Sequence, residues 1–266
     1  MTHPAHQHGQ ADILDLDADV LAEQIAAIVA SLPVETSPTR IVDLGAGTGA
    51  GTFALLDRFP DAQVAAVDAS PEHLHRLRDK AHAAGLADRV WTVQADLDAD
   101  WPDLGRPDLV WASASLHHMA DPDRTLRQVH DVLVPGGVLA VVELASFPRF
   151  LPDGDLADLE ERAHAASERE HAGHLPHRGA DWGPKLTAAG FTDLRERTIN
   201  VRIGQSDAVT RHAQTSLSRI RGAATLPADD LATLDRLLDP ADPRGIAHRD
   251  DLVLRTERTV WIASRG

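Results

Sequence analysis

Apolar runs suited to buried strands alternate with runs at helical spacing through the first 144 residues of this 266-residue chain. Within the strand-like runs the apolar character is nearly unbroken, as it is in strands that are covered on both faces. The five runs are RIVDLG (40–45), QVAAVDA (63–69), RVWTVQAD (89–96), DLVWASAS (108–115) and GVLAVVEL (137–144). This alternation predicts an α/β fold, with a doubly wound and mostly parallel sheet between layers of helices.

Helix signals mark the boundaries of these segments. Ser70 and Asp121 are each followed by a proline, which predicts an N-cap and a proline in the first helical position. A further amphipathic helix is expected from residue 15 to residue 32, after a flexible, His-containing tail over residues 1–12 that is too polar to order itself. The rest, residues 13–266, is predicted to be a single domain.

Charge and composition limit the partners of the chain. It has 26 Lys and Arg against 41 Asp and Glu, a formal net charge of −15, so its field would repel a nucleic acid backbone. It has no Cys, and no apolar run long enough to cross a membrane. We therefore expect a cytoplasmic protein with no nucleic-acid partner and no membrane span. The oligomeric state is not indicated.

The turn after the first strand-like run, GAGTGAG (45–51), is the feature most directly connected with function. Gly45, Gly47 and Ala50 formally match a dinucleotide-binding fingerprint, and Asp68 ends the next strand at the expected distance. An NAD(P)-dependent oxidoreductase is therefore one hypothesis. A P-loop is excluded because no Lys-Ser/Thr pair follows the glycines. Against a dinucleotide stands Asp43, whose carboxylate would repel a pyrophosphate at the helix N-terminus and suits a cationic group instead.

The pattern Asp43-x-Gly45-x-Gly47-x-Gly49 is similar to the first motif of the class I S-adenosylmethionine-dependent methyltransferases. Further segments resemble that family in the same order over residues 35–145: VAAVDAS, QADL, and the long DLVWASASLHHMADPDRTLRQVHDVLVPGGVLAVVEL, which is typical of the branch with ubiquinone and menaquinone methyltransferases. The resemblance implies a Rossmann-like seven-stranded sheet whose antiparallel last strand, LVLRTERTVWIAS, lies beside the sixth. It also implies a cofactor-binding half (35–145), a helical lid insertion (146–185), and C-terminal helices and edge strands (186–266).

The same resemblance assigns roles around the cofactor, S-adenosyl-L-methionine, and its product, S-adenosyl-L-homocysteine. Asp43 would act toward the amino group, directly or through water, Asp68 would hold the ribose hydroxyls, and Asp96 with Leu97 would hold the adenine. The complete expected set is Asp43, Gly45, Ala46, Gly47, Gly49, Asp68, Ala69, Asp96, Leu97, Ser113 and His118.

Methyl transfer from a sulfonium is an in-line displacement, so positioning in a closed, water-poor pocket supplies much of the catalysis, and a general base serves only some acceptors. Whether the methylated atom is O, N or C stays open. His117 and His118 follow the fourth strand and are candidate bases, although the LHH stretch also suits a role in shaping the cofactor pocket. His174 and His177 in the insertion are second candidates. Glu143, at the end of the fifth strand, could face the acceptor, cap a helix or pair with an arginine.

Other patterns carry weaker hypotheses. His3, His6 and His8 could gather a metal ion, but such a tail lacks supporting residues, so we expect no functional metal. A group of apolar residues in and near the insertion has two equally weighted interpretations. Its side chains could form a wall for an aromatic or apolar small-molecule acceptor, or they could pack inside the lid. Its members are Phe147, Phe150, Leu151 and Trp182. A binding protein that keeps the fold without turnover is the remaining alternative.

Overall fold

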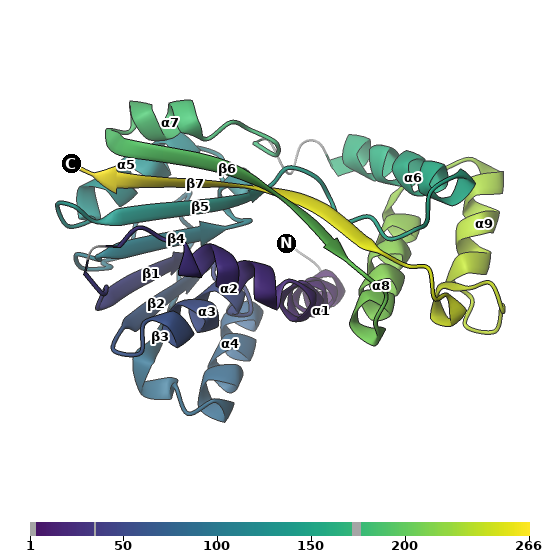
Figure 1. The fold of residues 1–266 in the computed structure, drawn as a ribbon, viewed down its shortest axis with the longest axis horizontal. Helices are drawn as coiled ribbons and strands as arrows, with labels where there is room; N and C mark the ends of the chain where they lie inside the picture. Colours follow the sequence, from purple (N-terminus) through teal and green to yellow (C-terminus); the bar gives the residue numbers. More distant parts are fainter. Residues whose placement is uncertain (1–3, 35, 172–176) are drawn as a thin grey trace. The chain divides into compact units, whose positions relative to one another are not determined.

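The computed structural model describes residues 4–34, 36–171 and 177–266, and in this part of the chain it contains a seven-stranded sheet (Figure 1). The strand order is β3-β2-β1-β4-β5-β7-β6. The strands are β1 (Arg40–Leu44), β2 (Gln63–Asp68), β3 (Val90–Gln94), β4 (Leu109–Ser113), β5 (Val138–Leu144), β6 (Phe191–Ile203) and β7 (Leu254–Arg265). The reversal of strand order beside β1 is where open α/β sheets bind their ligands.

Strands β1 to β5 are mutually parallel, and β7 runs against its neighbours. The N–H of Arg265, at the end of β7, donates to the carbonyl of Gly137, just before β5 begins. Along β6, the Thr198 hydroxyl lies 3.4 Å from that of Thr259, and the Thr192 hydroxyl donates to the carbonyl of Ser264. Both pairings are antiparallel, so the predicted doubly wound sheet, with an antiparallel last strand beside the sixth, is confirmed.

Helices connect these strands, and two of them begin where the sequence predicts. Ser70 and Asp121 are confirmed as N-caps, because their side chains accept from the N–H groups of His73 and Arg124. The helices are α1 (Pro4–Val20), α2 (Ala22–Ala30), α3 (Ala50–Arg58), α4 (Pro71–Ala83), α5 (Pro122–Val132), α6 (Asp155–His171), α7 (Gly183–Ala188), α8 (Asp207–Ala223) and α9 (Ala228–Leu238). Short 3-10 helices are η1 (Ala87–Arg89), η2 (Leu116–His118) and η4 (Ile246–His248).

Two apolar cores lie on opposite faces of the sheet, because successive side chains of a strand alternate between the faces. One core joins α5 and α7 to the sheet through residues such as Leu126 and Leu186, and the other joins α2 and α3 through residues such as Ile28 and Leu55. On β2, Ala65 and Val67 belong to the first core and Val64 to the second. Strands β1, β2, β4 and β5 are thus buried on both sides, which explains their nearly unbroken apolar sequences, whereas β3 at the sheet edge is only partly buried.

The N-terminal helices differ from the expectation. One helix was expected over residues 15–32, whereas the structure has α1 from Pro4 to Val20 and a second helix, α2, from Ala22 to Ala30. The apolar spacing that predicted a single helix continues through Leu21, which is buried at the junction. None of the described helices is long and apolar enough to cross a membrane.

The chain divides into two compact units. Unit 1 comprises residues 1–144, 177–199 and 259–266 and contains both cores described above. Unit 2 comprises residues 145–176 and 200–258 and contains α6, α8 and α9. The predicted lid insertion (146–185) overlaps unit 2, and its role as a lid stays a prediction.

Candidate cofactor and catalytic site

The glycine turn between β1 and α3 is the centre of the candidate site. Gly45, Gly47 and Gly49 all have positive φ angles, of +68°, +54° and +100°, a region that favours glycine. A Cβ at Gly45 would also lie 2.3 Å from Cβ of Ser115, which follows β4. Since real Cβ atoms do not approach so closely, Gly45 is required both for its conformation and for the close packing of the turn against the end of β4.

Asp68, the last residue of β2, lies against this turn. Its Oδ2 accepts from the N–H of Gly47 at 2.8 Å, and its Oδ1 accepts from the N–H of Ser70 at 2.8 Å. Nδ1 of His73 lies 3.2 Å from the same Oδ1. Burial alone would raise the pKa of Asp68, but the hydrogen bonds from His73, Ser70 and Gly47 more than offset it and hold the pKa below its ordinary value. An ionised carboxylate thus stands beside the glycine turn.

Asp43 lies beneath the turn rather than on its outer side. Its side chain is buried, with the residue 2% exposed, and Oδ2 accepts from the hydroxyl of Thr52 at 2.7 Å. Burial, with a smaller contribution from the negative charge of Asp68, raises its pKa to about 7. A buried group that holds its proton near neutral pH repels a pyrophosphate weakly, so the sequence argument that Asp43 opposes a dinucleotide loses force. Its expected role toward the amino group stays a prediction.

The other expected cofactor residues lie at the carboxyl ends of neighbouring strands. Ala69 follows β2 and is exposed, and Ser113 ends β4 and is partly buried. Asp96 follows β3, is exposed, and accepts from the N–H of Asp98 at 3.0 Å, while Leu97 is buried. The sheet therefore brings these positions to the same edge as the turn, as the parallel strand directions require.

Glu143 and His117 form a buried pair beside this edge. One oxygen of Glu143, Oε1, accepts from the N–H groups of Ser115 and Leu116, at 3.1 and 2.9 Å. The other, Oε2, lies 2.5 Å from Nδ1 of His117. Since a carboxylate only accepts, Nδ1 is the donor in this pair, and in the neutral form of the ring Nε2 is then the nitrogen that carries the lone pair. No described residue forms a hydrogen bond with that Nε2.

His118 differs from its neighbour. The residue is partly exposed to solvent, and its ring lies 4.2 Å from that of His117, measured between ring centroids. Desolvation of the ring and the nearby His117 lower its pKa to about 4. His118 is therefore neutral over the physiological range and is a weak base.

The remaining candidates are placed as follows. His177 lies in the turn before α7, partly buried, and its carbonyl accepts from the N–H of Ala180. His174 and His3 lie outside the described residues. Among the residues that the structure describes, no group of three or more metal-ligating side chains could hold an ion.

The apolar residues considered for an acceptor wall are largely interior. Trp182 is 1% exposed and belongs to a core of unit 1. In unit 2, Phe150 and Leu151 are fully buried, with the Phe150 ring edge-on to His212, and Phe147 packs near the ring of His164. For Trp182, Phe150 and Leu151, this burial favours the packing interpretation.

Some residues of the site were missed or left undecided from the sequence. His73, on the first turn of α4, had no signal that connected it with Asp68. Glu143 had several possible partners, and only the fold brings it to the loop that follows β4.

Comparison with known proteins agrees with this geometry. A family model described as a methyltransferase domain matches residues 42–139, from β1 into β5. The trans-aconitate 2-methyltransferase of Rhodococcus jostii (strain RHA1) is 32% identical over 216 residues, which cover 78% of this chain and 81% of that protein. The malonyl-[acyl-carrier protein] O-methyltransferase of Laribacter hongkongensis (strain HLHK9) is 33% identical over 165 residues, 59% of this chain and 52% of that one. The chain belongs to the class I S-adenosylmethionine-dependent methyltransferases.

Solved structures support the fold. The phosphoethanolamine N-methyltransferase 2 of Haemonchus contortus, in complex with S-adenosyl-L-methionine, superposes with a TM-score of 0.54 at 17% identity, covering 91% of this chain and 52% of that chain. The chain spans about half the length, or less, of several curated relatives that it matches.

Proposed function

We propose that this protein transfers the methyl group of S-adenosylmethionine to a small-molecule acceptor. The proposal rests mainly on one observation: the Asp68 carboxylate lies against the glycine turn and accepts a 2.8 Å hydrogen bond from the N–H of Gly47. Family membership supports the same activity, since the named relatives are methyltransferases. It also decides against the NAD(P)-dependent oxidoreductase, whose fingerprint these glycines match formally.

The chemistry of the donor set fits the cofactor. Asp68 offers two acceptor oxygens, which suit the paired hydroxyls of a ribose. The first N–H groups of α3 have no acceptor within the helix, and its N-cap, Gly49, provides no side-chain cap. These N–H groups suit the carboxylate at the methionine end. Leu97, buried after β3, offers an apolar contact for the adenine.

His117 supplies the proton acceptor in this proposal. When bound, the cofactor would supply a methyl group activated by its positively charged sulfur, and that sulfur would become a neutral thioether on transfer. An acceptor that carries a proton must lose it, and the free lone pair on Nε2 of His117 can take it. Glu143 holds the ring in the required tautomer and favours the imidazolium that forms. His118, with its lowered pKa, is the weaker candidate, and Asp43 under the turn takes no part in this proton transfer.

The acceptor is a small molecule in this proposal, and the relatives give the starting set for a screen. One relative is named for trans-aconitate and another for a malonyl-acyl carrier protein. Acceptors that are already anionic need no base, whereas alcohols and phenols do. The dependence of the rate on His117 therefore reports the class of acceptor.

The first experiment is calorimetry of the wild-type protein and of Asp68→Ala with S-adenosylmethionine, S-adenosylhomocysteine and NAD. We expect both nucleosides to bind, Asp68→Ala to weaken both by about 10-fold or more through lost hydrogen bonds, and NAD to give no signal. The control is Asp88→Ala, which changes a carboxylate in η1, far from the glycine turn in the sequence. NAD binding without nucleoside binding would overturn the proposal.

Turnover is tested separately. Wild-type protein is incubated with S-adenosylmethionine carrying a labelled methyl group and with the acceptor set, and labelled product is counted. Tight nucleoside binding without transfer to any acceptor would favour the alternative of a binding protein that keeps the fold.

A further inference from the structure

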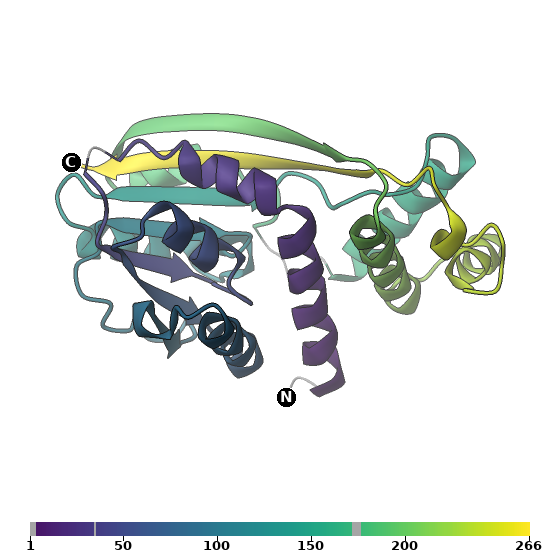
Figure 2. The same ribbon diagram turned by 60° about the horizontal axis from the view of Figure 1, so that its bottom comes forward.

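Helix α1 packs directly against the glycine turn. A Cβ added at Gly47 would lie 3.2 Å from Cδ1 of Leu14, which is in the middle of α1. Ala11, one helical turn before Leu14, is fully buried. The helix therefore covers one side of the turn that, under the proposed function, receives the methionine end of the cofactor. In Figure 2, α1 is the long purple helix beside the ends of the strands.

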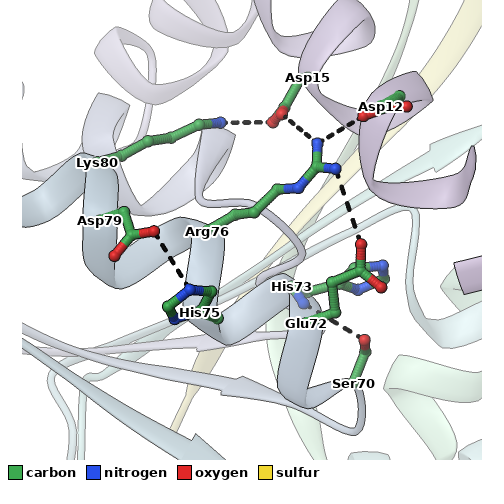
Figure 3. A network of polar contacts seen from close by, with 9 residues as sticks. All are labelled: Asp12, Asp15, Ser70, Glu72, His73, His75, Arg76, Asp79 and Lys80. Carbon is green, nitrogen blue, oxygen red and sulfur yellow. Dashed lines mark hydrogen bonds and ion pairs between the residues drawn. The ribbon is translucent and has the colours of Figure 1, made fainter. Parts of the chain in front are cut away.

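Charged side chains hold α1 on α4, as Figure 3 shows. Nη1 of Arg76 lies 2.7 Å from Oδ1 of Asp12 and 3.0 Å from Oδ2 of Asp15. Nζ of Lys80 lies 2.5 Å from Oδ1 of Asp15. These side chains are partly exposed, with side-chain exposures of 29% for Arg76, 39% for Lys80 and 31% for Asp15. Pairs of this kind are individually weak and are screened by salt.

Lys80 also reaches the turn itself. Its Nζ donates to the carbonyl of Thr48 at 3.2 Å, so one ammonium group connects α1, α4 and the residue between Gly47 and Gly49. The same helix, α4, carries His73, which contacts the carboxylate of Asp68. Helix α4 thus connects α1 to both parts of the proposed cofactor site.

We propose that Lys80 is a positioning residue that keeps α1 against the glycine turn and thereby sets the lifetime of the bound cofactor. The inference rests on the proposed function. Lys80 donates to the backbone carbonyl of Thr48, and it affects the cofactor indirectly, through the turn and α1. Because the contacts are partly exposed ion pairs, α1 separates from α4 more often when they are removed or when salt is raised.

The test measures dissociation of S-adenosylhomocysteine by stopped flow, in wild-type protein, Lys80→Met, Asp15→Asn and the double variant. We expect each single variant to accelerate dissociation about 3- to 10-fold, as the loss of an ion pair in a small network allows. The double variant should accelerate dissociation by less than the product of the two single effects, since both changes remove the Lys80–Asp15 pair. Each change also removes a contact of its own, that of Asp15 with Arg76 or that of Lys80 with the carbonyl of Thr48. Lys80→Arg should restore part of the wild-type lifetime. Raising the salt concentration should accelerate dissociation from the wild-type protein more than dissociation from the double variant.

The matched control removes an ion pair that lies in unit 2. Nε of Arg221, on α8, lies 2.7 Å from Oδ1 of Asp235, on α9. Asp235→Asn should leave the dissociation rate unchanged. If Lys80→Met lowers thermal stability but dissociation stays at the wild-type rate, Lys80 is only structural and this inference fails while the proposed function stands. If the wild-type protein does not bind the nucleoside at all, the proposed function fails, and the inference fails with it.

Discussion

At the residue scale, the buried carboxyl group of Asp43 makes stability depend on pH. Burial raises its pKa from 3.8 to about 7 in the folded state. Between these values the unfolded chain has released the proton and the folded chain has kept it, so rising pH favours unfolding. The effect is absent below pH 3.8, grows up to about pH 7, and is then constant. A shift of this size corresponds to roughly 4 kcal/mol at most.

Asp43→Asn removes the ionisation and keeps an oxygen that can accept from Thr52. We expect the free energy of unfolding of Asp43→Asn, relative to wild type, to rise between pH 4 and pH 7 and to level off above pH 7. The new amide hydrogens add an offset that does not depend on pH. Urea unfolding at several pH values provides the measurement. Parallel curves for the two proteins would show that Asp43 is ionised at neutral pH in the folded state.

His117 and His118 differ in surroundings, and this predicts different kinetic effects. For an acceptor that must lose a proton, His117→Asn should lower kcat by about 10²- to 10⁴-fold, the usual contribution of a general base. Affinity for S-adenosylhomocysteine should stay at the wild-type level. His118→Asn should have the smaller effect on kcat, because a group with a pKa of about 4 is a poor base near pH 7.

Comparing these two variants shows which of the two imidazole rings acts as the general base. Steady-state rates and calorimetric affinities are measured for both proteins with the same acceptor. A larger loss of kcat in His118→Asn would reverse the assignment. With an acceptor that is already anionic, neither change should lower kcat by this amount.

At the scale of the element, the turn between β1 and α3 depends on glycine for two separable reasons. Gly45 and Gly136 have similar φ angles, +68° and +76°. A Cβ at Gly136 would meet nothing within 4 Å, whereas one at Gly45 would lie 2.3 Å from Cβ of Ser115. Gly136→Ala therefore reports the backbone cost alone, about 1–2 kcal/mol.

Gly45→Ala should lose more, roughly 2–5 kcal/mol in the free energy of unfolding, because packing strain adds to the backbone cost. It should also weaken binding of S-adenosylhomocysteine, since the turn must move away from β4. Gly136→Ala should bind as wild type does. Equal losses of stability in the two variants would mean that the turn accommodates the extra carbon without strain.

The elements that the sequence predicts well are those with local signals. The strands β1 to β5 have nearly unbroken apolar runs, and Ser70 and Asp121 are residue types that favour the N-cap of a helix. The N-terminal helices were harder to delimit. The start of α1 at Pro4 lies in polar sequence with little apolar periodicity, and its attachment to α4 depends on Arg76 and Lys80, more than 60 residues away.

The candidate site shows the same limit. The turn and Asp68 were predicted because a sequence motif fixes their spacing. The pairing of Glu143 with His117 was not, because the two residues lie 26 positions apart and meet only when β4 and β5 lie side by side. The placement of Asp43 beneath the turn likewise depends on Thr52, on the helix that follows.

At the scale of the whole molecule, the division into two units predicts where the cofactor stabilises the chain. The proposed cofactor site is formed by residues of unit 1, and the two large cores consist of unit 1 residues. Unit 2 has buried residues of its own, among them Leu217 on α8 and Leu234 on α9. A ligand that binds only folded unit 1 stabilises that unit by mass action, by about 2.7 kcal/mol at 100 times its Kd.

Amide hydrogen exchange, read by mass spectrometry of peptides, tests this at saturating S-adenosylhomocysteine. For amides in β1 and β4 that exchange only when unit 1 unfolds, the rate should fall about 100-fold at that concentration. Amides in α8 and α9 should exchange at the rate of the free protein. Strands β6 and β7 each run through both units and therefore connect them along the chain. Equal protection of α8 and α9 would therefore show that the units unfold together, and that the chain is one cooperative body.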